Sequence, residues 1–266
     1  MTDSYDTLMD HLAALAVEAV HCAETAVQSY WLAVAARREV VTSSWTLEML
    51  LQQTQTDPDL ALPNWTRGLA PQALACVLHQ RRWLETPAPP IPRQGLTYAE
   101  LARDAQAVLH WRDEYQPYLS DIRDTTCRLW HAVCRLYGPR PAALAALPEE
   151  VLRGVVLFEA GLYFACHEYF ETLWGRTADA ASDFYQGLIQ VAVAMRHLES
   201  HNIRGASILL RAGMGRLQRY PAVYKGLHLA AWLWRLETLL EYLETLPSPT
   251  AYQFDPMQVP PILSLE

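Results

Sequence analysis

The amino-acid sequence predicts an all-α protein, in which an antiparallel bundle of about four helices follows an additional N-terminal helical region. Apolar residues recur at helical spacing along most of the chain, and the strict alternation that is typical of strands is missing. The connectors in the C-terminal half are short, as they are between antiparallel neighbouring helices. Apolar residues make up 51% of the 266 residues, which is enough for a sizeable core.

We divide the chain into an N-terminal helical region at residues 1–147, a C-terminal helical bundle at 148–247 and an extended proline-rich tail at 248–266. In the N-terminal region, periodic runs are separated by stretches rich in proline and glycine. The expected helices are residues 5–40, a short helix from a cap at Ser43 or Ser44 to about Gln53, Pro71 to about Glu85, and Thr97 to Tyr137 with a kink or break at Pro117.

The C-terminal half has a more regular pattern. It predicts helices at about residues 149–174, 180–199, 203–218 and 226–246. From Pro247 onward the chain carries five prolines, so we expect this tail to lie extended along the surface.

Charge and cysteine content limit the function classes. The chain has 21 Lys and Arg against 29 Asp and Glu, which argues against nucleic-acid binding and favours a protein partner or a homo-oligomer. The N-terminus is acidic, and no run of about 18 uncharged apolar residues occurs, so we expect neither a secretory signal nor a membrane span. Five scattered cysteines without a C-x-x-C pair indicate reduced thiols and a cytoplasmic location.

The densest group of polar and aromatic residues lies in FEAGLYFACHEYFETLW, residues 158–174. His167 and Glu171 are four residues apart and share a helix face, Glu168 flanks them, and Trp174 lies about one turn further on. The run resembles the His-Glu-x-x-His signature of zinc proteases, but Glu171 stands where the second histidine would be.

The next expected helix carries a matching stripe. Its members are spaced by three or four residues and therefore lie on one face: Asp183, Gln186, Gln190, Ala194 and His197. Gly187 lies beside the stripe and would let another backbone approach closely. In an antiparallel pair the stripe can face His167 and Glu171, which predicts one polar pocket or seam between the two helices.

Three interpretations of this seam remain open. It is a satisfied hydrogen-bond network that fixes helix register, a pocket that orients a ligand, or a metal or acid–base centre. In the metal interpretation the ligands are His167, Glu171 and His197, with Glu168 or Asp183 as general base, and a divalent metal is the one cofactor considered.

Arginines near the end of the third helix of this half, Arg211, Arg216 and Arg219, either complement the helix dipole or contact an anion.

Several separated blocks carry a family resemblance: Phe158-x-x-Gly161, Tyr163-Phe164, His167-Glu168-x-x-Glu171-x-x-Trp174, Asp183-Phe184-x-Gln186-Gly187-Leu188-Ile189-Gln190, Asn202-x-x-Gly205-Ala206 and Leu209-Leu210. In this order they resemble the family called domain of unknown function 309, over roughly residues 153–220. The resemblance implies a small all-α bundle with the polar residues in one site, and it implies no particular activity.

We therefore expect a non-catalytic binding or scaffold module. Its contact regions would be the polar pocket and a protein-contact surface on the N-terminal helices. The alternative is a metal-dependent hydrolase or another small-molecule enzyme that uses His167, Glu171 and His197.

Overall fold

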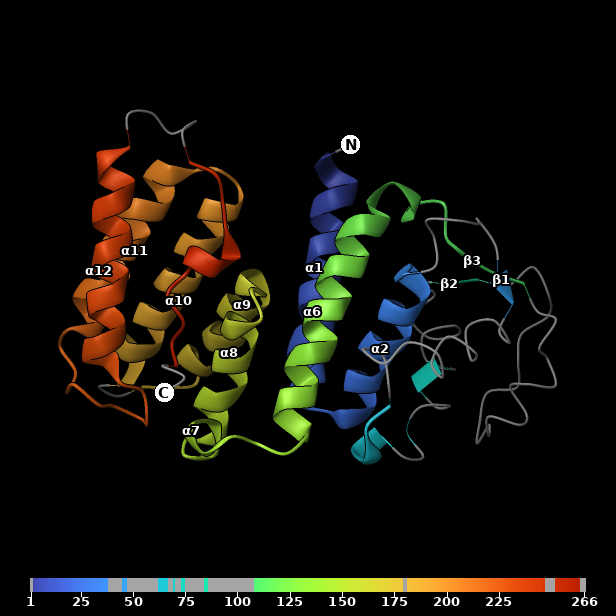
Figure 1. The fold of residues 1–266 in the computed structure, drawn as a ribbon, viewed down its shortest axis with the longest axis horizontal. Coiled ribbons are helices and arrows are strands. Elements are labelled where there is room, and N and C mark those ends of the chain that lie inside the picture. The colour runs from blue at the N-terminus through green and yellow to red at the C-terminus, as the bar shows by residue number, and fades with distance from the viewer. Residues whose placement is uncertain are drawn as a thin grey trace. The chain divides into compact units, whose positions relative to one another are not determined.

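Helices make up most of the computed structural model, and the all-α prediction is confirmed (Figure 1). The structure describes residues 2–37, 45–46, 62–66, 69, 73–74, 84–85, 108–178, 181–246 and 252–263. Contacts divide the chain into two units, Met1–Gly138 and Pro139–Glu266, and each is described by itself. Within the described residues, no helix combines the length and apolar character that a membrane crossing needs.

The N-terminal unit is built on three long helices, α1 (Thr2–Ala19), α2 (Ala23–Arg37) and α6 (Leu119–Tyr137), which pack on one another. Every side chain from Thr25 to Ala36 is buried. Aromatic rings fill the interior: the Tyr30 ring centre lies 4.9 Å from that of Trp31 and 4.8 Å from that of Trp130. A helix buried on all sides must lie between other elements, and α2 does so.

The single helix expected over residues 5–40 is wrong, because the chain turns at Val20 to Cys22. There the backbone N–H groups of His21 and Cys22 both donate to the Glu18 carbonyl, at 3.0 and 2.9 Å. One straight helix would carry the buried, mostly apolar α2 segment away from α1. The turn instead folds α2 back against α1, where its apolar surface is removed from water.

The N-terminal unit also contains a small antiparallel sheet in the order β1-β3-β2. Its strands are β1 (Trp45–Thr46), β2 (Leu84–Glu85) and β3 (Val108–Trp111). These strands lie where helices were expected, and those helical assignments are wrong at these residues. A short apolar run such as Val108–Trp111 fits a helix or a strand by periodicity alone, and pairing with distant segments decides between them.

Most of the other N-terminal predictions, including the cap at Ser43 or Ser44 and the start at Thr97, lie outside the described residues. The break at Pro117 is confirmed. Pro117 lies in a 3₁₀ turn, Gln116–Tyr118, and α6 begins directly after it. A short 3₁₀ turn is a common way to lead into an α-helix.

The C-terminal unit begins with the short α7 (Ala142–Ala145) and continues with α8 (Glu149–Glu159), α9 (Tyr163–Trp174), α10 (Ala181–Glu199), α11 (Ile203–Leu217) and α12 (Leu229–Thr245). From α8 to α12, each helix packs on the next one in sequence. Figure 1 shows these helices side by side, coloured from olive to red.

The single helix expected over residues 149–174 is wrong, because α8 ends before α9 begins. Gly161 has φ 70°, and the Leu162 N–H donates to the Leu157 carbonyl at 3.0 Å. This is the hydrogen bond of a Schellman helix end, which requires a left-handed residue and favours glycine. His201 fills the same position after α10 with φ 56°.

Helices α10 and α11 meet at two glycines. A Cβ added to Gly187 would lie 2.8 Å from Leu217 Cγ, and one added to Gly213 would lie 2.9 Å from the Gly187 carbonyl oxygen. Both distances are too short for a real Cβ, so the two backbones lie closer than larger residues permit. The role expected of Gly187 is confirmed.

The loop before α12 ends in a tight hairpin. Lys225 and Gly226 have φ 47° and 77°, and Tyr224 and Leu227 exchange two backbone hydrogen bonds. Two positive φ values in a two-residue turn are typical of type I′. This turn occupies the start that was expected for the last helix, which begins at Leu229 instead.

The tail lies closer to the bundle than a surface segment would. Tyr252, Ile262 and Leu263 are buried, and Glu159 Oε1 accepts the Ile262 N–H at 2.6 Å. The tail therefore contributes apolar side chains to the core of the C-terminal unit.

We predict that Gly213→Ala lowers the free energy of unfolding by about 1–3 kcal/mol, because the new methyl overlaps α10. Gly215→Ala is the matched control in the same helix: a Cβ there meets nothing within 4 Å. It should stabilise the chain by about 1 kcal/mol through helix propensity. Urea denaturation measures both changes, and equal effects of the two substitutions would contradict the close helix contact.

We also predict that Cys22 is alkylated before the buried thiols. It is exposed, and a hydrogen bond from the Thr25 backbone N–H lowers the pKa of its thiol. Burial raises the pKa of Cys134 to about 12 and also raises the pKa of Cys166. Only the thiolate reacts with iodoacetamide. At pH ~8 the reagent should therefore label Cys22 at least about tenfold faster than Cys134 or Cys166. Mass spectrometry of timed samples measures the order, and early labelling of Cys166 in the native chain would contradict it.

Candidate functional site

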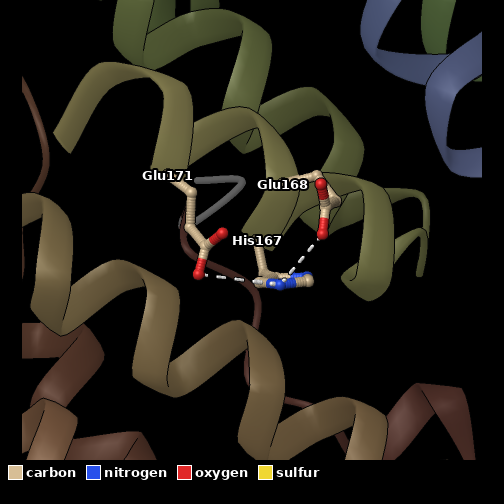
Figure 2. Close-up of side chains that lie close together, drawn as sticks. All are labelled: His167, Glu168 and Glu171. Atoms are coloured by element: carbon tan, nitrogen blue, oxygen red, sulfur yellow. Dashed lines mark ion pairs between the residues drawn. The ribbon is translucent and has the colours of Figure 1, made fainter. Parts of the chain in front are cut away.

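Helix α9 presents two different faces. Its buried face carries Cys166, Tyr169 and Phe170, and the Phe170 ring occupies the space left by Gly154 of α8. The other face carries His167, Glu168 and Glu171, so the packing of the apolar residues determines which way these three point. Figure 2 shows the three side chains converging from one helix.

A backbone carbonyl of the same helix orients the imidazole of His167. Its Nδ1 lies 2.8 Å from the Phe164 carbonyl oxygen, and its ring centre lies 5.0 Å from that of Phe164. A carbonyl oxygen only accepts hydrogen bonds, so Nδ1 is the donor and carries a proton. This contact leaves Nε2 as the nitrogen that faces outward from the helix.

Two carboxylates surround that outward nitrogen. His167 Nε2 lies 3.3 Å from Glu168 Oε1 and 3.9 Å from Glu171 Oε1. The three ligand atoms lie within 4.8 Å of one another. The His167 side chain is 14% exposed, whereas those of Glu168 and Glu171 are 46% and 50% exposed.

The two carboxylates beside His167 Nε2 favour a positive charge at the centre of the cluster. With Nδ1 protonated, a neutral ring directs the Nε2 lone pair at two negative groups. A cation between the three ligand atoms turns this repulsion into attraction. The three residues could therefore hold a metal ion.

Two members of the α10 stripe, Asp183 and Gln190, pair with α11 and not with this cluster. Arg216 of α11 binds both of them: Nη1 lies 2.6 Å from Asp183 Oδ1, and Nε donates to Gln190 Oε1 at 3.2 Å. Arg219 adds a second contact to Asp183, at 3.1 Å. The seam that we expected between α9 and α10 is therefore divided at these two residues, which α11 binds.

The remaining candidates lie elsewhere in the C-terminal unit. His197 lies at the end of α10, where its Nδ1 is 3.0 Å from Asn202 Nδ2, and it does not join the three-residue cluster. Gln186 is partly buried on α10. Trp174 ends α9 and is 41% exposed.

Sequence reasoning missed a second polar group, near the hairpin before α12. Lys225 Nζ lies 3.4 Å from Glu150 Oε1 and 5.6 Å from the centre of the Tyr185 ring. Burial raises the pKa of Tyr185, and nearby Lys225 partly offsets this rise. Burial also raises the pKa of Tyr169 to about 12, and its hydroxyl donates to the Glu150 carbonyl oxygen. Both phenols therefore stay neutral at pH 7 and act as packing and hydrogen-bonding groups.

In the sequence, the Lys225-Gly226 pair was the one signal of the hairpin turn.

Comparison with known proteins finds a family that part of the chain resembles. The model described as Domain of unknown function (DUF309) matches residues 151–209, from α8 into α11. This match confirms the resemblance seen in the sequence motifs. No curated protein matches the chain, and no solved structure matches it.

We predict that neutral His167 carries its proton on Nδ1, which is the less common form of free imidazole. At pH ~9, above the ordinary range for imidazole titration, the ¹⁵N shifts of its two ring nitrogens should be those of the Nδ1–H form. His201, which is exposed, is the comparison in the same spectrum. An Nε2–H form for His167 would contradict the contact with Phe164.

Proposed function

We propose that the DUF309 segment of this chain is a binding module that holds one divalent metal ion on the outer face of α9. The ligands would be His167 Nε2 and the carboxylates of Glu168 and Glu171. The orientation of His167 carries this proposal, because its Nδ1 is already bound to the Phe164 carbonyl. Metal-binding histidines usually anchor the second ring nitrogen in this way.

The spacing of the three ligand atoms supports the proposal. Zinc binds imidazole nitrogen and carboxylate oxygen at about 2.0–2.2 Å, so two ligands of one tetrahedral ion lie roughly 3–4 Å apart. The distances from Nε2 to Glu168 and Glu171, 3.3 and 3.9 Å, fall in this range. One nitrogen and two oxygens suit zinc, manganese or iron.

The exposure of the cluster supports a site that binds a further ligand. Glu168 and Glu171 are about half exposed, and all three ligands come from one helix turn. An ion held there keeps open positions toward solvent. We propose that a group of a protein partner fills them, in keeping with the acidic, cytoplasmic protein that the composition suggests.

Binding is a better proposal than hydrolysis. A metal hydrolase needs a general base beside the metal-bound water. Asp183, one candidate for that base, is held by Arg216 and Arg219 on the α10–α11 side. Glu168 is the other candidate for the general base. Because His197 does not join the cluster, Glu168 has to serve as the third metal ligand.

We predict that the chelator-treated full chain binds one Zn²⁺ or Mn²⁺ per molecule in a calorimetric titration. A metal at about 100 times its Kd should raise the free energy of unfolding by about 2.7 kcal/mol, which a thermal melt detects. His167→Ala should weaken binding at least about tenfold, because it removes the one nitrogen ligand. Glu171→Gln should weaken it as well.

His197→Ala is the matched control, since it removes a histidine of the same unit that lies outside the cluster. It should leave metal affinity unchanged. Metal binding that survives His167→Ala but is lost with His197→Ala would overturn the proposed ligand set. Absence of binding by the folded wild-type chain would overturn the proposed function.

A further inference from the structure

We propose that the C-terminal unit carries a second binding surface, separate from the α9 cluster, which recognises an uncharged Pro-Pro-aliphatic segment of a partner protein. The chain's own residues 259–263, Val-Pro-Pro-Ile-Leu, occupy this surface and show its chemistry. We call it the tail-binding surface and define it by Glu159, Tyr163, Trp232 and Arg235.

The tail-binding surface contacts the main chain of the bound segment at four consecutive residues. Trp232 Nε1 donates to the Pro260 carbonyl at 3.1 Å, and Arg235 Nη2 donates to the Pro261 carbonyl at 2.9 Å. Glu159 Oε1 accepts the N–H groups of the next two residues, Ile262 and Leu263, at 2.6 and 3.2 Å. The segment bends at Ile262 and Leu263, so that both N–H groups reach the same carboxylate oxygen. Such contacts recognise the main chain of a bent segment with its prolines in a fixed position.

The two prolines suit this pattern for physical reasons. Proline has no N–H, so Pro260 and Pro261 offer carbonyls without leaving a buried donor unpaired. Their fixed φ also reduces the entropy lost when the segment becomes ordered. An aromatic indole that donates to a proline carbonyl is a feature shared with polyproline-binding domains.

Apolar contacts add affinity and side-chain preference. Val259, Ile262 and Leu263 are 9%, 2% and 7% exposed, so the segment buries its aliphatic side chains. Earlier in the tail, the Phe254 ring lies against that of Tyr163, with 6.5 Å between the ring centres. The uncharged segment brings no second negative charge to Glu159.

The receiving groups belong to helices and not to the tail. Trp232 and Arg235 are three residues apart on α12, and Glu159 is the last residue of α8. The Trp232 ring also packs edge-on against Phe158, at 5.7 Å. The surface is therefore in place for a segment from another chain whenever the chain's own tail is displaced.

The test uses the full chain with a weakened tail. Ile262→Asp puts a charge at a buried position and should release the tail without changing the helices. A fluorescent peptide with the sequence of residues 252–263 should then bind saturably in an anisotropy titration. It should bind the wild-type chain at least about tenfold more weakly, because a tethered tail competes at an effective concentration on the order of millimolar.

Matched variants separate recognition from nonspecific sticking. Adding Trp232→Phe to the Ile262→Asp chain keeps an aromatic ring and removes the indole donor, and Glu159→Gln removes the charge that accepts the two amides. Each should weaken peptide binding several-fold while circular dichroism shows a folded bundle. A peptide with both prolines changed to alanine should also bind more weakly.

Two outcomes would overturn the proposal: no saturable binding to the folded Ile262→Asp chain, or equal binding of the proline-free peptide. Metal titration of the same Ile262→Asp chain is a separate readout. Loss of peptide binding with metal binding intact would refute only the tail-binding surface, and the reverse would refute only the α9 metal site.

Discussion

The close approach of α10 and α11 at Gly187 and Gly213 determines which polar residues of the C-terminal unit pair with one another. With the two backbones in contact, Arg216 of α11 reaches both Asp183 and Gln190 across the helix pair. A charged guanidinium that bonds two groups at once occupies two polar members of the α10 stripe, Asp183 and Gln190. The cluster on α9 is left to face solvent with its own charges, which makes it the candidate ligand site.

The sequence predicted the helices with strong periodicity and failed where a single residue or a pairing between distant segments decides the structure. Helices α10 and α11 lie close to their expected bounds, and their tight contact was anticipated from Gly187. The break at Gly161 was missed because the apolar pattern continues through it, while a single left-handed residue reverses the chain. The strand Val108–Trp111 depends on pairing with distant residues, which local spacing does not report.

Of the residues predicted for the polar pocket, the structure brings His167, Glu168 and Glu171 together and places others with different partners. Spacing of three and four residues shows which side chains share a helix face, but it does not show which neighbouring helix covers that face. His167 and Glu171 do come together, whereas Asp183 pairs with arginines that were considered only for the helix dipole or an anion. The contact that orients His167 is with a backbone carbonyl, and no side-chain pattern reveals it.

The docked tail affects the order in which the C-terminal unit can be completed during synthesis. Residues 259–263 follow every helix of the unit in sequence, yet they cover Trp232 and satisfy Glu159. While the chain is being translated, α8 and α12 are finished before the segment that shields them exists. Exposed apolar surface on a nascent chain is a binding target for chaperones and a cause of aggregation. In any state in which α8 and α12 are packed and the tail is not yet docked, the indole of Trp232 is uncovered.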